Sequence, residues 1–242
     1  MSTLEERMKQ YEECSKISLM RRSPVIIRID GRAFHTFTRN LDKPFDVTIE
    51  RSMTSTMLYL CLRISGCVLG YTQSDEISLV LCDYQTIDRQ PWFGNELQKL
   101  VSVSASMATL AFNRAFAGEV FSDTTPYKEA IALGATFDAR AFTLPRDEVT
   151  NYLIWRQQDA TRNSIQSVGH ANFSEKEMHG LNMDEIQEKL FQEKGINWGM
   201  DFSNYQKRGA CCVKSEFGWG IDYETPIFTQ DREYIENRIT FE

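Results

Sequence analysis

Two groups of acidic residues lie where the chain is expected to turn, and acids placed in this way can bind a divalent cation. Asp30 follows the apolar run 25–29, which predicts a buried strand ending in a turn. Asp75 and Glu76 lie between two further apolar runs, and this pattern predicts a hairpin with acids at its tip. Magnesium prefers carboxylate oxygens together with carbonyl, water and phosphate oxygens. Asp30, the Gly31 carbonyl and Asp75 therefore form a candidate site for two magnesium ions near a triphosphate.

The same residues also have a simpler interpretation, because acids in turns are usually solvated. The backbone N–H groups of 31–35 can cradle a phosphate, although the sequence has no glycine-rich loop of the P-loop type. Lys43, Arg32 and His35 either supply positive charge to a triphosphate or are ordinary surface and loop residues. Five later cations either contact RNA phosphates or form a solvated face: Arg156, Arg162, Lys207, Arg208 and Lys214.

Two amphipathic helices are predicted between the strands. Apolar residues recur at three- and four-residue spacing over 48–65, with Asp46 or Thr48 as the N-cap and Gly66 as the terminator. A second apolar stripe covers 95–116, and we expect Gly118 to end that helix.

The order of the predicted elements indicates how the acids meet. Strands at 25–29, 67–71, 77–81 and 136–144 alternate with the helices as βαββαβ, the split βαβ arrangement of ferredoxin-like domains. Polymerase palms and nucleotide cyclases share this arrangement. Because its first strand lies beside the hairpin, we expect the carboxylates to converge.

We therefore predict an α+β protein in two parts. Residues 1–145 form a ferredoxin-like palm catalytic domain, and residues 146–242 form a mainly helical and irregular C-terminal portion packed on the palm. Helices are predicted over 147–168 and 183–194 in the second part.

Composition limits the other possibilities. With 242 residues, 42% of them hydrophobic, the chain can bury a full core, and a net charge of −7 argues against a general nucleic-acid coat. Any nucleic-acid contact must be a local patch. The polar start lacks a signal-peptide core and no run spans a bilayer, so we expect a cytoplasmic protein. The six cysteines form no CxxC pair and are expected to be reduced thiols.

Several motifs together resemble the tRNA(His) guanylyltransferase family. They read IIRIDGRAFHTFT, DKPFD, GYTQSDEISLVL, FDARAFTLP and WRQQDATRNSIQ and extend from Val25 to Gln166, with a further YQKRG resembling a late family motif. The resemblance implies a palm-type enzyme that adds nucleotides to the 5′ end of tRNA in the 3′-to-5′ direction. ATP first activates the 5′ end, and GTP or another nucleoside triphosphate is then added. It also implies a homotetramer.

The resemblance also assigns roles to residues. Asp30, the Gly31 carbonyl and Asp75 match the metal ligands, and Glu76 matches an important acid beside them, so that Asp30, Asp75 and Glu76 are the expected catalytic residues. The nucleotide-binding segments match Asp30, Gly31, Arg32, Ala33, Phe34, His35, Lys43, Ser74 and Asp75.

One departure from the family pattern bears on specificity. Eukaryotic members have a histidine-led motif after Trp-Arg-Gln-x-Asp, whereas this chain has Thr161 at the histidine position. It thus resembles the bacterial and archaeal members that repair 5′-truncated tRNAs by Watson–Crick templating. The alternatives are another palm enzyme, such as a cyclase or a 5′-to-3′ polymerase, and a non-catalytic module that binds tRNA or nucleotides.

Overall fold

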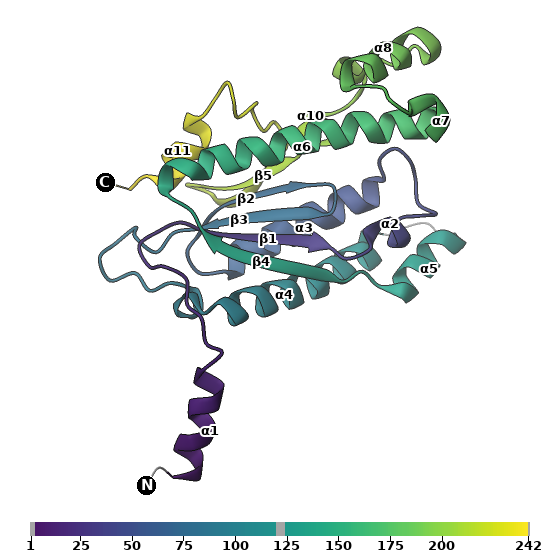
Figure 1. The fold of residues 1–242 in the computed structure, drawn as a ribbon. Helices are drawn as coiled ribbons and strands as arrows, with labels where there is room; N and C mark the ends of the chain where they lie inside the picture. The colour runs from purple at the N-terminus through teal and green to yellow at the C-terminus, as the bar shows by residue number, and fades with distance from the viewer. Residues whose placement is uncertain (1–2, 120–123, 242) are drawn as a thin grey trace.

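A six-stranded antiparallel sheet forms the centre of the molecule (Figure 1). The computed structural model describes residues 3–119 and 124–241. The strand order is β4-β1-β3-β2-β5-β6. The strands are β1 (Val25–Gly31), β2 (Cys67–Gln73), β3 (Glu76–Leu81), β4 (Phe137–Thr143), β5 (Ala210–Ser215) and β6 (Gly218–Asp222).

Helices cover both faces of this sheet, with α4 on one side and α6 on the other (Figure 1). Helix α3 packs beside α4 on the same face. The helices are α1 (Leu4–Glu13), α2 (Phe34–Phe37), α3 (Val47–Arg63), the 3₁₀ helix η1 (Trp92–Asn95), α4 (Leu97–Glu119), α5 (Thr125–Leu133), α6 (Arg146–Asn172), α7 (Glu175–Met178), α8 (Met183–Lys194), α9 (Trp198–Asp201), α10 (Asn204–Arg208) and α11 (Glu233–Ile239).

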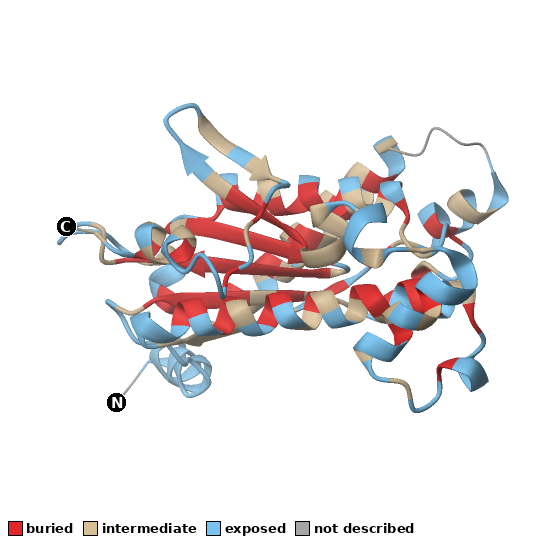
Figure 2. Ribbon diagram, turned by 90° about the horizontal axis from the view of Figure 1, so that it is seen from above, coloured by how far each residue is buried: buried red, intermediate tan, exposed pale blue. Residues whose placement is uncertain are grey.

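Alternation along β1 explains why the sheet is buried on both faces. Ile27 and Ile29 belong to the core cluster that contains Phe112 of α4, while Ile26 belongs to the cluster that contains Leu153 of α6. Successive strand residues point to opposite faces, so a continuous apolar run fills both cores. Figure 2 shows the result, because the central strands are buried along most of their length while the N-terminal helix is exposed.

The βαββαβ prediction is confirmed. The first four strands lie in the order β4-β1-β3-β2, which places the first strand beside the hairpin. Helix α3 begins after Asp46, whose Oδ1 accepts hydrogen bonds from the backbone N of Thr48 at 2.9 Å and of Ile49 at 3.1 Å. Asp46 is therefore the N-cap.

Two details differ from the sequence-based expectation. Helix α4 includes Gly118, so the predicted stop at that residue is wrong; a single glycine inside a long packed helix only weakens it. The C-terminal portion contains strands as well as helices, since β5 pairs with β2 and β6 with β5. It thus extends the sheet of the palm.

Two further observations concern the helices and the cysteines. None of the helices in the described ranges is long and apolar enough to cross a membrane. All six cysteines are free thiols, as expected, and four of them are buried: Cys61, Cys82, Cys211 and Cys212.

Candidate nucleotide and metal site

A tight hairpin turn delivers the second pair of acids to the end of β1. Ser74, with a φ of 50°, and Asp75 connect β2 to β3, and the strand register pairs Glu76 with Asp30. The backbone N of Gly31 donates a hydrogen bond to the backbone O of Asp75 at 3.1 Å. The structure therefore brings Asp30, Gly31, Asp75 and Glu76 to one end of the sheet.

The Asp75 carboxylate has an unfavourable environment for its charge. Burial, followed by the negative charge of Asp30, raises the pKa of Asp75 to about 6. Ser74 Oγ donates a hydrogen bond to Asp75 Oδ1 at 3.0 Å. Within the described ranges, no lysine or arginine forms an ion pair with Asp30 or Asp75. Two neighbouring carboxylates without a protein cation are an arrangement that an external cation stabilises.

Gly31 permits the close approach of the backbone to Asp75. A Cβ atom at this position would lie 2.9 Å from Asp75 Oδ2 and 2.5 Å from Phe34 Cδ2, both shorter than van der Waals contact. Phe34 is itself fixed by packing on Phe37 and Phe112. Only glycine therefore fits between the Asp75 carboxylate and the aromatic cluster.

A cavity of about 490 Å³ opens beside this turn. Asp30 and Arg32 do not line it; Arg32 is exposed and its backbone N donates a hydrogen bond to the backbone O of Thr136 at 2.8 Å. The remaining predicted nucleotide-binding residues do line it: Gly31, Ala33, Phe34, His35, Lys43, Ser74 and Asp75.

The opposite wall comes from residues to which the sequence assigned no role. They lie on α6 and on the segment around α10, and they include Asn163, Ser164, Tyr205 and Gln206. Asn163 and Ser167 both line the cavity and are four residues apart on α6, a spacing that puts two polar side chains on one helix face. This four-residue spacing and the YQKRG motif are the sequence signals from which the opposite wall could have been predicted.

Glu50 and Asp46 add further negative charge to the cavity wall. Burial raises the pKa of Glu50, and Asp46 acts in the same direction. Gln206 Nε2 donates a hydrogen bond to Glu50 Oε1 at 3.0 Å, and Tyr127 Oη donates one to Asp46 Oδ2 at 2.6 Å. Asp46 is thus occupied by structural hydrogen bonds and by its capping role.

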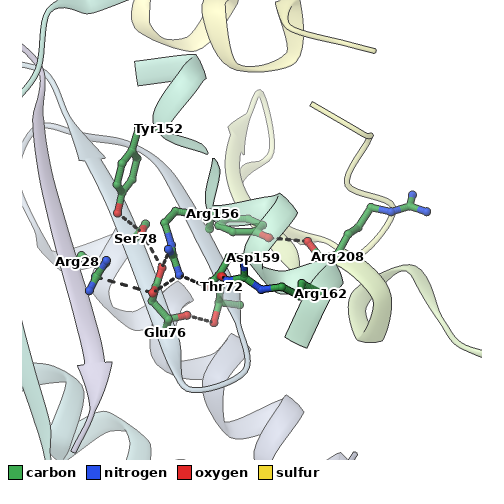
Figure 3. Close-up of polar contacts among 10 residues, drawn as sticks. Arg28, Thr72, Glu76, Ser78, Tyr152, Arg156, Asp159, Arg162 and Arg208 are labelled. Atoms are coloured by element: carbon green, nitrogen blue, oxygen red, sulfur yellow. Dashed lines mark hydrogen bonds and ion pairs between the residues drawn. The ribbon is translucent and has the colours of Figure 1, made fainter. Parts of the chain in front are cut away.

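Two arginines, Arg28 and Arg156, lie beside Glu76 (Figure 3). Arg156 of α6 binds it with two charge-assisted hydrogen bonds, from Nε to Oε1 and from Nη2 to Oε2, both at 2.8 Å. Arg28 Nε lies 3.8 Å from Glu76 Oε2. Burial raises the pKa of Glu76, while the charge of Arg156 opposes this shift. Glu76 thus joins α6 to the hairpin.

The position of Arg156 excludes the alternative, considered from the sequence, that this residue contacts an RNA phosphate. Arg156 is 5% exposed and also donates to Asp159 Oδ2 at 2.8 Å, so it cannot meet an RNA phosphate. Asp159 in turn accepts from the exposed Arg162. The WRQQD motif therefore contains a buried ion-pair network that fixes the position of α6 on the sheet.

The donor set at the turn is small. Within 3–119 and 124–241, no three histidine, cysteine, aspartate or glutamate side chains gather as a metal-binding group. An ion at this turn would thus be held by Asp30, Asp75 and a backbone carbonyl, a hard oxygen set that suits magnesium and leaves room for water and phosphate oxygens.

The fold and the cavity define a palm-type domain with two neighbouring carboxylates at the end of its first strand and hairpin. Residues 5–145 match the model of the family described as tRNAHis guanylyltransferase. The chain belongs to this family.

Three relatives illustrate the relationship. A solved bacterial tRNA(His) guanylyltransferase-like protein in complex with ATP has 47% identity and a TM-score of 0.91, covering 99% of this chain and 100% of its own. Another such structure, in complex with GTP, has 41% identity and a TM-score of 0.81 with the same coverage. The tRNA(His) guanylyltransferase of Schizosaccharomyces pombe is 30% identical over 215 residues, 84% of this chain and 77% of the relative.

Proposed function

We propose that this chain is a template-dependent nucleotidyltransferase that adds nucleotides to the 5′ end of tRNA in the 3′-to-5′ direction. ATP activates the 5′ end, and GTP or another nucleoside triphosphate is the nucleotide added. The observation that carries the proposal is the pair Asp30 and Asp75, two close carboxylates with which no described lysine or arginine forms an ion pair, beside a cavity of about 490 Å³. Family membership and relatives solved with ATP and with GTP support it.

Asp30, Asp75 and the Gly31 carbonyl would hold magnesium in this proposal. Such ions polarise phosphate oxygens and make an attacking hydroxyl more acidic. The protein's own contribution is to hold the two carboxylates together before any ligand binds, at the expense of the raised pKa of Asp75. Lys43 and His35 line the same cavity and would place positive charge beside a triphosphate.

Glu76 has a positioning role in this scheme. Because both of its carboxylate oxygens are bound by Arg156, it fixes the hairpin relative to α6. The Asp75 carboxylate, one residue earlier, is thereby held in place, and small displacements of reacting groups can cost about a hundredfold in rate.

The decisive experiment uses tRNA that lacks its first 5′ nucleotide. With magnesium, ATP and each nucleotide in turn, we expect G to be added opposite C, and a change of the opposing base to A to switch the preference to U. We expect the enzyme to select its nucleotide by base pairing and not by the identity of the tRNA, because Thr161 replaces the eukaryotic histidine. Addition of G regardless of the opposing base would contradict templating. A cyclic nucleotide product, or binding without turnover, would favour one of the alternatives.

We further propose that the chain assembles as a homotetramer, as the family resemblance implies. Light scattering at working concentration tests this directly. A strictly monomeric species would exclude it.

A further inference from the structure

A second cavity, of about 620 Å³, lies at the other end of β2. Cys67 and Val68 of β2 line it, whereas Gln73 and Ser74 line the first cavity. Six residues of strand separate the two positions, or roughly 20 Å at the usual rise. The end of α3, the β5–β6 hairpin and α11 complete its wall. Four cationic side chains line it: Arg63, Arg89, Lys214 and Arg238.

None of the ion pairs among the described residues neutralises these positive charges. No aspartate or glutamate is among the described residues that line the cavity, and no carboxylate in that part of the chain forms an ion pair with any of the four cations. Glu236, a near neighbour on α11, pairs instead with Arg232 at 3.2 Å.

Aromatic rings position two of the four cations. The guanidinium of Arg63 lies 4.8 Å from the centre of the Tyr59 ring, and that of Arg238 lies 4.1 Å from the centre of the Tyr234 ring. A ring face orients a guanidinium without removing its charge. Both arginines therefore keep their charge, although Nη1 of Arg238 already donates a hydrogen bond to the backbone O of Tyr234.

The charge balance of this cavity is opposite to that of the protein. The chain carries 34 acidic and 27 basic residues, so four cations with no acid among the described lining residues are a marked local reversal. The C-termini of α3 and α11 each contribute only about half a negative charge to the wall. The net field in the cavity thus favours an anion.

We propose that this cavity binds phosphate groups of the RNA backbone, as a second contact for the tRNA whose 5′ end lies in the first cavity. This inference rests on the proposed function. Arg63, Arg89 and Lys214 are exposed and come from three separate segments, a distribution that suits a series of phosphates better than one small anion. Trp219 pairs directly with Lys214 across the hairpin and offers an apolar surface beside the charge.

The test removes the exposed charges together in an Arg63→Gln, Arg89→Gln, Lys214→Gln variant. We expect the Kd for full-length tRNA to rise roughly tenfold or more, and the salt dependence of log K to weaken by up to about 0.9 for each phosphate that the variant no longer neutralises. Turnover at saturating tRNA should stay unchanged. The matched control is Lys16→Gln, Arg114→Gln, Lys176→Gln, which removes the same charge from exposed positions that line neither cavity. It should bind tRNA nearly as the parent does.

Two further arms separate the outcomes. A 5′-phosphorylated hairpin duplex of four base pairs extends only about 14 Å along its axis, at roughly 3.4 Å per base pair. The two cavities are roughly 20 Å apart, so the triple variant and the parent should use this duplex equally well. A higher KM for ATP with this duplex would identify a free-nucleotide site and overturn the RNA proposal, as would unchanged tRNA affinity and salt dependence. If the parent binds tRNA but adds no nucleotide to either RNA, the proposed function fails. The contact between the second cavity and tRNA is then still tested by the Kd for tRNA of the parent and the triple variant.

Discussion

The two cavities at opposite ends of β2 have opposite charge. The first, of about 490 Å³, is lined by Asp42, Asp46, Glu50 and Asp75, with Lys43 as its one lysine or arginine among the described lining residues. The second, of about 620 Å³, is lined by four cations and by no acid in the part of the chain that the structure describes. The charge at one end of the sheet therefore attracts cations, and the charge at the other end attracts anions.

The two ends also differ in how their charges are held. Asp75 sits in a tight turn tied to Gly31, and its raised pKa records the cost of bringing it close to Asp30 in a buried place. Arg63, Arg89 and Lys214 are exposed, so their charges stay solvated and their placement there costs little. The fold specifies the acids rigidly and the cations loosely. Substitutions at the first end should therefore affect chemistry, and substitutions at the second should affect affinity.

The largest expected effect comes from Asp75→Asn. The substitution keeps the size of the side chain but removes a charge that we propose binds magnesium, so turnover should fall by several orders of magnitude. Thermal unfolding should show equal or greater stability, because the substitution removes an unfavourable buried charge. Asp30→Asn should lower turnover in the same way. Single-turnover addition to truncated tRNA measures the effect, and turnover within tenfold of the parent would contradict the proposed site.

A large effect on stability, without direct contact with either cavity, is expected from Arg156→Ala. This change leaves buried Glu76 without its two charge-assisted hydrogen bonds and with only the more distant Arg28, at 3.8 Å, which should lower the free energy of unfolding by about 3–5 kcal/mol. Arg162→Ala is the matched control, since the Arg162 side chain is 57% exposed where it meets Asp159, and should cost less than about 1 kcal/mol. Urea unfolding of both variants gives the comparison. Equal losses would show that the network is not a specific buried support.

The palm could be predicted from the sequence because its signals are local. The apolar run before Asp30 and the polar break at 72–76 specify strands and a hairpin by themselves, and topology then places them side by side. Of the nucleotide-binding residues that the family resemblance implied, those that line the first cavity lie on only one of its walls. Its other wall brings Asn163 and Gln206 toward Asp75, and contacts between residues so far apart in the chain depend on tertiary packing that periodicity does not report.

The same limit explains the C-terminal strands and the role of Glu76. β5 is short, and its place in the sheet follows from pairing with β2, which no local pattern indicates. Asp75 and Glu76 are adjacent in the sequence and both acidic, so composition treats them alike. Only the position of α6, which brings Arg156 onto Glu76, separates a candidate metal ligand from a buried ion pair.

Gly31→Ala should produce a smaller effect at the acidic end. The added methyl group would overlap Phe34 and the Asp75 carboxylate, and relief of that overlap should cost about 1–3 kcal/mol of stability. Displacement of Asp75 should lower nucleotide addition roughly a hundredfold. Gly118→Ala in α4 is the control, because no atom of the described residues lies within 4 Å of the new Cβ and alanine favours a helix. Unchanged activity in the Gly31 variant would mean that the close approach to Asp75 is dispensable.

The smallest expected effect is the pH dependence that Glu50 contributes to stability. Burial and the negative charge of Asp46 raise the pKa of Glu50 above its usual value of 4.5. As pH rises from about 4.5, the unfolded chain therefore loses this proton before the folded protein does, and the free energy of unfolding falls until the pH has passed the raised pKa. Glu50→Gln has no proton to lose, so its stability relative to the parent should increase as the pH is raised from 4 to 7.

Urea unfolding at several pH values measures the difference, with exposed Glu175→Gln as the control for removal of one carboxylate. The glutamine variants of the cationic cavity should leave the slope unchanged, because arginine and lysine do not titrate in this range. Parallel pH profiles of the free energy of unfolding in the parent and in Glu50→Gln would contradict this prediction. They would show that the neighbouring carboxylates of the first cavity do not destabilise one another, and the proposed difference between the two ends of the sheet would then fail.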